Sequence, residues 1–343
     1  MKALVLEEYN QLVYKDVPEP EFGDDEVLVK VKAVGICGSD IHGIDGSTGR
    51  RIPPIIMGHE ASGVIEELGA NVKNWSKGDR VTFDSTIYPL DDWFTRKGLY
   101  NLSDDRMVLG VSIEDYRRHG AFAEYVVIPK HILCKIPDKV TFVQAAMVEP
   151  AGVAVHGVEL TPIALNDTAV VMGAGMIGIF TIQALRAAGC GKIIAVDLED
   201  EKLDLALTLG ADVGLNPNNG DVPEEVLKLT DNRGADVGID AVGIDATVNS
   251  ALKSIRKGAP LTLVGNFSPQ ISIPLQWIVS RQIKLIGSCG ICGEFEAVLA
   301  MYENGTLKPE AILSATAPLS EGVSWFERLY NKEKGLMKVV LIP

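Results

Sequence analysis

The stretch Thr168–Leu185, TAVVMGAGMIGIFTIQAL, decides the fold class of this chain. It carries no charged residue over 18 positions, which is the lower limit for a membrane-spanning helix. Three glycines interrupt it after a short apolar run, however, and Arg186 ends it. A buried strand, a tight turn and a buried helix explain this pattern better than a membrane span. We therefore expect a strand over 169–172 and a helix over 176–188.

The glycines of this stretch, Gly173, Gly175 and Gly178, form a GxGxxG motif between the expected strand and helix. In a dinucleotide-binding turn the first glycine makes the tight turn, the second admits the pyrophosphate, and the third lets helix and strand pack closely. The backbone N–H groups at the start of the helix, around Met176 and Ile177, would stabilise the phosphates together with the helix dipole. We expect this turn to bind a dinucleotide; the alternative is a glycine-rich turn without a ligand.

Asp197 stands 19 residues after Gly178, at the end of the next expected strand. An acidic residue in this position accepts hydrogen bonds from the adenosine ribose of a bound dinucleotide. Because its charge would repel a 2′-phosphate, Asp197 predicts a preference for NAD over NADP.

Strands and helices alternate from Thr168 to Gly287, in the rhythm of the βαβ units that form a doubly wound parallel sheet. The earlier part of the chain differs, because short apolar runs are separated there by Gly, Pro, Asn and Asp. Within it, Glu26–Val34 alternates like a half-buried strand, and the whole pattern indicates an irregular β-barrel or sandwich. We expect an α/β protein with a coenzyme domain over 149–287 and a catalytic domain formed by residues 1–148 and 288–343.

The composition excludes several classes of protein. The chain has 343 residues, of which 47% are hydrophobic and 23% charged, as in globular proteins. A net charge of −14 at pH 7 makes nucleic acid an unfavourable partner. Five scattered cysteines suit a reducing compartment, and the acidic Glu7 and Glu8 argue against an N-terminal signal peptide. We expect a cytoplasmic protein that binds neither nucleic acid nor a membrane.

Three separate parts of the chain carry residues that suit a divalent metal ion. Cys37 lies in GICGSDIH, His59 and Glu60 lie in GHEASG, and Glu149 stands where the two expected domains meet. A thiolate, an imidazole and a carboxylate match Zn²⁺, and three protein ligands with one open position are typical of a catalytic site. Each residue alone has a simpler interpretation: Cys37 as a buried apolar side chain, His59 as a core histidine, Glu149 as a charge at a helix start. Their combination with a dinucleotide motif favours the metal.

Several motifs together identify a family. The run GHEASGVIEELGANV, residues 58–72, fits the pattern G-H-E-x2-G-x5-G-x2-V without a gap, and GICGSDIH, GDRV, GAFAEYVVIP, EPAGVAVHG and GAGMIG occur in the family's order. On these motifs the chain resembles the zinc-containing medium-chain dehydrogenases over nearly its whole length. It is most similar to the polyol branch, which includes sorbitol, galactitol-phosphate, butanediol and threonine dehydrogenases. The resemblance implies a GroES-like β-barrel, built from both chain ends, around an inserted Rossmann domain.

The resemblance also implies a ligand set. Cys37 and His59 would bind zinc, and Glu60 is usually the third ligand in the polyol branch, with Glu149 holding the metal-bound water. Glu149 could instead coordinate directly, so the two glutamates are exchangeable at this point. Asp40 would be the carboxylate that orients His59 and fixes its tautomer.

The reaction that follows from the resemblance is a hydride transfer between a secondary alcohol and NAD. Zinc would act as a Lewis acid on the substrate hydroxyl, and Ser39, the nicotinamide ribose and His42 would carry the proton away. The substrate would be a polyol, a sugar alcohol with or without a phosphate, or a vicinal diol. The alternatives are a threonine-type or other secondary-alcohol dehydrogenase, a zinc-free quinone reductase, and a non-catalytic dinucleotide-binding protein.

The chain departs from most of these relatives in the region of a second, structural zinc. Relatives hold that ion with cysteines spaced C-x2-C-x2-C-x7-C, and the corresponding positions here are Pro89, Asp92, Thr95 and Ser103. Since closed zinc sites of this kind need thiolates, we expect one zinc per subunit. The segment Thr86–Met107, called the lobe below, would be held by packing instead.

Three other features have more than one interpretation. Cys289 and Cys292 stand where sorbitol dehydrogenases usually carry an Arg-Tyr pair, which weakens sorbitol as the substrate, and we expect two ordinary thiols there. Arg50 and Arg51 would either bind a substrate phosphate or form a solvated loop pair. The apolar strand Ile283–Gly287 could pair edge to edge with a second copy, so we expect a homodimer or homotetramer.

Overall fold

The computed structural model describes all 343 residues, Met1–Pro343. The chain divides into two compact units, one formed by Met1–Glu149 with Ile291–Pro343 and the other by Pro150–Gly290. None of its helices combines the length and the apolar character that a membrane crossing requires. The uncharged stretch considered above forms strand β13 (Thr168–Met172) and most of helix α4 (Met176–Ala187).

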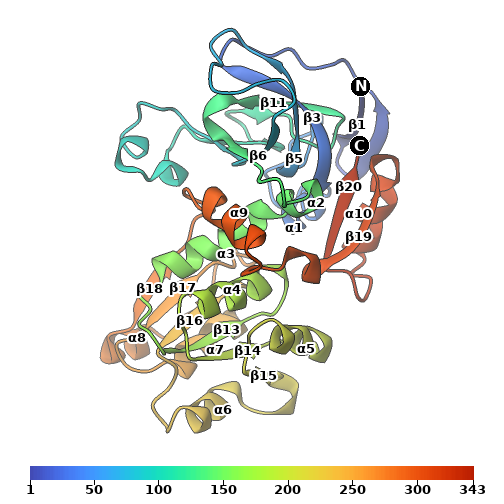
Figure 1. Cartoon of the computed structure of the whole chain (residues 1–343). Coiled ribbons are helices and arrows are strands. Elements are labelled where there is room, and N and C mark those ends of the chain that lie inside the picture. Colours follow the sequence, from blue (N-terminus) through green and yellow to red (C-terminus); the bar gives the residue numbers. More distant parts are fainter. The chain divides into compact units, whose positions relative to one another are not determined.

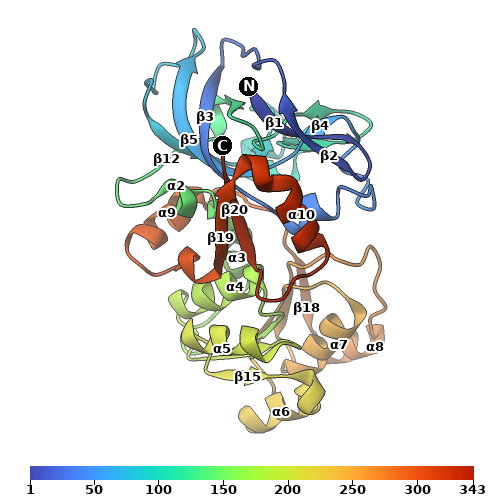
Figure 2. The same cartoon turned by 90° about the vertical axis from the view of Figure 1, so that its right-hand side faces the viewer.

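The first unit is built on a seven-stranded sheet with strand β3 (Glu26–Gly35) at its centre. β3 pairs antiparallel with β5 (Glu60–Leu68), with β11 (Tyr125–Pro129) and, at its far end, with β20 (Lys338–Ile342). Figure 2 shows β20, in red, beside the blue β3, so the C-terminal strand completes a sheet that the N-terminal part begins.

The alternating pattern of β3 explains why this segment is a strand. Val27, Val29 and Val31 are buried in the core, whereas Lys30 is exposed. Burying one such side chain stabilises the fold by roughly 1.5–3 kcal/mol, so the register of β3 is well determined. The other elements of the first unit are β1 (Lys2–Glu8), β2 (Gln11–Asp16), α1 (Gly38–Ile41), β4 (Ile55–Ile56), β6 (Arg80–Phe83), β7 (Thr86–Ile87), β8 (Met107–Val108), β9 (Val111–Ser112), β10 (Arg117–Arg118), β12 (Leu133–Lys135), α2 (Phe142–Ala145), α9 (Phe295–Glu303), β19 (Leu313–Pro318) and α10 (Gly322–Tyr330), and helix α3 (Val148–Leu160) begins in this unit.

The second unit is a six-stranded parallel sheet in the order β15-β14-β13-β16-β17-β18. Counted from β13, this is the order 3-2-1-4-5-6 of a dinucleotide-binding doubly wound sheet. Helices α4 and α5 lie on one side of it and α7 on the other (Figures 1 and 2). The predicted parallel sheet is therefore confirmed. Its remaining elements are β14 (Lys192–Val196), α5 (Asp200–Thr208), β15 (Val213–Leu215), α6 (Val222–Leu229), β16 (Val237–Asp240), α7 (Asp245–Ser254), β17 (Pro260–Leu263), α8 (Leu275–Arg281) and β18 (Lys284–Gly287).

Candidate active site

Two neighbouring strands of the first unit bring together residues that are distant in sequence. Cys37 directly precedes the short helix α1, just after β3, while His59 precedes β5 and Glu60 begins it. Because Gly35 at the end of β3 pairs with Glu60, the two segments meet. One ligand atom from each of Cys37, His59 and Glu60 lies within 4.8 Å of the others.

The donor atoms of this cluster fit a zinc ion. His59 and Glu60 are buried, and Oε1 of Glu60 has no hydrogen-bond partner within the protein. A buried polar atom without a partner costs about 1–3 kcal/mol, so such atoms are normally satisfied by another group. A thiolate, an imidazole and a carboxylate are together the donor set of catalytic zinc sites. The residues present therefore fit the metal that the sequence motifs imply.

The electrostatics of the cluster also favour a cation. Oδ1 of Asp40 lies 3.5 Å from Nδ1 of His59, as expected for a carboxylate that orients this ring. Burial lowers the pKa of His59, but the neighbouring Asp40 and Cys37 outweigh it and raise that pKa well above its ordinary value. Burial alone would raise the pKa of Asp40, yet His59 and Arg51 hold it well below its usual range. The side chains around His59 thus create a negative potential.

Glu149 lies outside the cluster of three converging donors. It is the second residue of α3, and burial raises the pKa of its carboxyl to about 7, with the His59 ring opposing this shift and Glu60 adding to it. Glu149 therefore interacts electrostatically with both residues. Of the two glutamates that the sequence left exchangeable, Glu60 is the one whose carboxylate converges with Cys37 and His59.

The two residues expected to carry a proton lie on the same short helix. The Ser39 hydroxyl donates a hydrogen bond to Sγ of Cys37 at 3.3 Å. His42 follows the last residue of α1, and its half-buried side chain stands three residues after Ser39. Residues three apart share one face of a helix, so the side chains of Ser39 and His42 lie on the same side of this helical turn.

A buried lysine next to the cluster was not predicted from the sequence. Lys338, at the start of β20, is fully buried, forms an ion pair with Oε2 of Glu60 and donates a hydrogen bond to the Ile36 carbonyl at 3.0 Å. A Cβ on Gly35 would displace both partners of this pair, so the glycine leaves room for it. The available signal was a single charged residue opening the otherwise apolar stretch KVVLIP.

The environment of Arg51 differs from both of those that the sequence suggested. Its neighbour Arg50 is exposed, but Arg51 is 2% exposed and pairs with Asp40 at 2.9 Å. Both the phosphate-binding and the solvated-pair interpretations are therefore wrong for Arg51, because the guanidinium is buried against a carboxylate of the same chain.

The glycine turn of the second unit has the expected backbone form. Gly173 has a φ of +90°, which side-chain-bearing residues rarely adopt, and a Cβ on Gly178 would overlap its carbonyl. Gly175 precedes α4, whose first residues are Met176 and Ile177, and a Cβ on Gly175 would meet no protein atom within 4 Å. The turn thus leaves a ligand room beside the start of a helix.

Asp197 fixes this turn to the end of β14. Its Oδ2 accepts a hydrogen bond from the Ala174 N–H at 2.7 Å, and its Oδ1 accepts one from the Glu199 N–H at 3.1 Å. A carboxylate has about four lone-pair sites, so the half-exposed Asp197 keeps acceptor capacity for a ribose.

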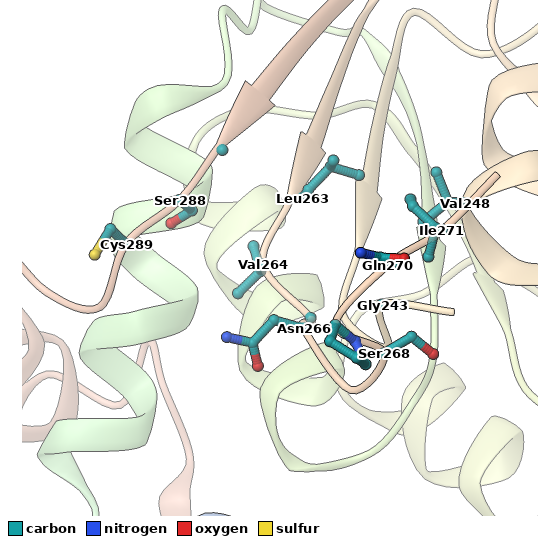
Figure 3. A pocket seen from close by; sticks show the side chains of 13 residues that line it. Gly243, Val248, Leu263, Val264, Asn266, Ser268, Gln270, Ile271, Ser288 and Cys289 are labelled. Carbon is teal, nitrogen blue, oxygen red and sulfur yellow. The ribbon is translucent and has the colours of Figure 1, made fainter. Parts of the chain in front are cut away.

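A pocket lies at the carboxyl ends of β17 and β18 in the same unit. Figure 3 shows Leu263 and Val264 on one strand end, Ser288 and Cys289 on the other, and Gln270 in the loop that follows β17. Ligands of doubly wound sheets bind outside the carboxyl ends of the strands, so this pocket lies on the ligand-binding edge of the sheet.

Comparison with known proteins identifies the family. An alcohol dehydrogenase GroES-like domain model matches residues 23–138, and a zinc-binding dehydrogenase model matches residues 177–304. A sorbitol dehydrogenase of Bacillus subtilis (strain 168) is 31% identical over 100% of this chain and 97% of its own length. The chain belongs to the zinc-containing medium-chain dehydrogenases. The resemblance stated on the sequence motifs is confirmed, and so is the GroES-like and Rossmann fold class.

Two further relatives bear on substrate and cofactor. A D-arabitol-phosphate dehydrogenase of Enterococcus avium is 32% identical over 94% of this chain and 91% of its own length. A solved structure from Sinorhizobium meliloti 1021, bound to NADP, is 30% identical, with a TM-score of 0.92 over 100% of this chain and 99% of that one. This dehydrogenase is therefore similar to proteins that act on free and phosphorylated polyols, and to one that binds a nicotinamide dinucleotide.

Proposed function

We propose that this dehydrogenase transfers a hydride between a secondary alcohol of a polyol or sugar alcohol and NAD, with zinc at the cluster in its first unit. The observation that carries the proposal is the convergence of Cys37, His59 and Glu60 within 4.8 Å, in a chain that also contains a dinucleotide turn. Its similarity to sorbitol and D-arabitol-phosphate dehydrogenases supports the substrate class.

In this proposal each residue of the cluster has a chemical role. Cys37, His59 and Glu60 hold the zinc, which supplies Lewis-acid chemistry to the reacting oxygen of the substrate when it is bound. Ser39 would accept the proton of the substrate hydroxyl while it donates its own proton to the nicotinamide ribose, from which His42 would pass a proton toward solvent. The cofactor supplies the hydride chemistry, and the protein aligns it with the substrate.

The preference for NAD rests on Asp197. Its carboxylate would accept hydrogen bonds from the ribose hydroxyls of NAD and would repel the 2′-phosphate of NADP. NADP is the second candidate because the Sinorhizobium meliloti relative binds it. We expect kcat/KM for NAD to exceed kcat/KM for NADP by about tenfold or more, which corresponds to about 1.4 kcal/mol. In Asp197→Ser we expect the ratio of these two kcat/KM values to be smaller. A wild-type enzyme that prefers NADP would rule out the assignment of Asp197.

We also propose that two copies associate through the edge strand β18. This strand ends the parallel sheet, and Leu285 within it is 37% exposed. An open strand edge pairs readily with a second copy across a two-fold axis. Sedimentation of the wild-type enzyme and of Leu285→Glu tests this proposal. We expect the wild type to sediment as an oligomer and Leu285→Glu to dissociate, and a monomeric wild type would contradict the proposal.

The function is tested by a substrate screen. Polyols, sugar phosphates, vicinal diols and threonine are offered with NAD, and reduced cofactor is followed by absorbance in the wild type and in Cys37→Ser. Cys134→Ser, which removes a thiol on β12 outside the cluster, is the matched control. We expect Cys37→Ser to lose about 10³-fold or more in rate, because the Lewis acid contributes several kcal/mol, while Cys134→Ser stays active. Full activity in Cys37→Ser refutes the proposal, and NAD binding without turnover of any alcohol points to a non-catalytic protein.

A further inference from the structure

Arg51 is a buried cation that fits closely between its neighbouring residues. It is 2% exposed, and its backbone forms a β-bridge with Ser112. Gly43 makes room for its stem, because a Cβ at that position would collide with Cγ of Arg51. An arginine is almost never fully buried without a partner, so its contacts are expected to be specific.

The guanidinium contacts two side chains of helix α1. Its Nη2 donates to Oδ1 of Asp40 at 2.9 Å and to Oγ of Ser39 at 3.3 Å, and its Nε also donates to Oδ1 of Asp40, at 3.3 Å. Its Nη1 donates to the Arg50 carbonyl at 3.0 Å, which fixes the plane of the group. A single rigid fork therefore holds both a carboxylate and a hydroxyl.

Each of these two partners touches a candidate zinc ligand. The oxygen of Asp40 that Arg51 binds is the one 3.5 Å from Nδ1 of His59. The Ser39 hydroxyl donates to Sγ of Cys37 at 3.3 Å. Because a guanidinium only donates, it occupies a lone pair of the Ser39 oxygen and leaves the hydroxyl proton to point at the sulfur. Two chains of contacts, through Asp40 and through Ser39, thus run from Arg51 to the cluster.

We propose that Arg51 is a positioning residue for the metal site: by holding Asp40 against His59 and Ser39 against Cys37, it sets the affinity of the site for zinc. The inference rests on the proposed function, since it takes Cys37 and His59 as ligands. Outer partners that orient metal ligands typically change metal affinity by about 10–100-fold when they are removed. Arg51 would act on two ligands at once without touching the metal, the substrate or the cofactor.

The test measures zinc binding itself and needs no turnover. Metal-free wild type, Arg51→Met, Arg51→Lys and the control Arg50→Met are titrated with Zn²⁺ alone against a chromogenic chelator, and the thermal unfolding of each metal-free protein is recorded. We expect Arg51→Met to raise the Kd for Zn²⁺ about 10–100-fold. Arg51→Lys keeps the positive charge but loses the planar guanidinium, so it should raise the Kd for Zn²⁺ less than Arg51→Met does. Arg50→Met should have the Kd of the wild type.

A second variant covers the case in which Arg51→Met does not fold. Gly43→Ala removes no polar group; its Cβ would displace the stem of Arg51 and also press on the Ser39 carbonyl, which would lie 3.0 Å away, so a raised Kd in that variant supports a role for the contact between Arg51 and Ser39. A purely structural role would lower the unfolding temperature of the metal-free protein and leave the Kd unchanged. The inference is overturned if the Kd for Zn²⁺ of Arg51→Met lies within about twofold of the wild-type value. If Arg51→Met does not fold, the same result in Gly43→Ala overturns it. If Cys37→Ser loses zinc at the same time, the proposed function stands; if the wild type binds no zinc, both fail.

Discussion

The cluster of Cys37, His59 and Glu60 and the lobe, Thr86–Met107, are the two regions in which the resemblance to the zinc-containing medium-chain dehydrogenases led us to look for a zinc site. In the cluster His59 and Glu60 are buried, and Oε1 of Glu60 has no hydrogen-bond partner within the protein. In the lobe two of the positions that would carry ligands bond each other instead, since the Thr95 hydroxyl donates to Oδ2 of Asp92 at 2.7 Å. The lobe positions Pro89, Asp92, Thr95 and Ser103 carry neither a thiolate nor an imidazole, whereas the cluster carries both.

Packing and hydrogen bonds connect the lobe internally and to its surroundings. The rings of Tyr88 and Tyr100 stack with their centroids 4.1 Å apart, and the Tyr100 hydroxyl donates to Oδ2 of Asp84 at 2.6 Å. The thiol of Cys292, expected to be an ordinary cysteine, donates to the Gly98 carbonyl at 3.1 Å. Each of these contacts is weak beside a zinc–thiolate centre, so the comparison predicts that changes in the cluster cost more than changes in the lobe.

The largest effect on stability is expected at the ion pair in the cluster. Replacing Lys338 by Met leaves the buried Glu60 carboxylate without its cation, and breaking such a pair costs about 3–5 kcal/mol. Urea unfolding of the metal-free protein at pH 7 measures the loss. Lys77→Met, which breaks the exposed pair with Glu66, is the control and should cost at most about 1 kcal/mol. Equal losses in the two variants would show that the cluster is not held by buried charge.

An effect of intermediate size is expected from pH at the edge of the lobe. Burial raises the pKa of Asp84 from 3.8 to about 6, although the Tyr100 hydroxyl and Thr86 donate hydrogen bonds that oppose the shift. Between these two values the folded state binds more protons than the unfolded state, so stability should fall as pH rises through this window and then level off. The expected loss is on the order of 3 kcal/mol relative to Asp84→Asn.

This prediction is checked by urea unfolding of metal-free wild type and Asp84→Asn from pH 4 to pH 8. The difference between the two curves isolates Asp84 from the other carboxyls that titrate in the same range. Parallel curves would mean that Asp84 is not held in its neutral form.

The smallest effect is expected from the stacked tyrosines. Tyr88→Leu keeps an apolar side chain but loses the ring contact with Tyr100, which is worth about 0.5–1.5 kcal/mol. The zinc content should not change, because the lobe contributes no ligand in this account. Unfolding and metal analysis of the same preparation measure both, with Tyr9→Leu, an exposed tyrosine, as the control. Loss of zinc in Tyr88→Leu would show that lobe and cluster are coupled.

Local patterns in the sequence predicted much of the fold and part of the site. The glycine turn at Gly173 and the strand β13 are encoded within a few consecutive residues, so their form could be predicted directly. The proximity of Cys37 to His59 and Glu60 was predicted by family resemblance, since no local rule relates the segment after β3 to the segment at the start of β5.

Arg51 and Lys338 could not be predicted in the same way. The roles of both depend on partners brought near by the packed sheet: Asp40 for Arg51 and Glu60 for Lys338. A charged residue in a sequence is normally solvated, and only the folded chain shows that these two are buried. Their identification needed the side-chain positions rather than a longer motif.

The metal content of the purified protein tests the central claim most directly. After loading with zinc and removal of the excess, metal analysis should find about one zinc per chain in the wild type and almost none in Cys37→Ser. Two zinc ions per chain would show that the lobe binds metal after all, and an unchanged content in Cys37→Ser would show that the cluster does not.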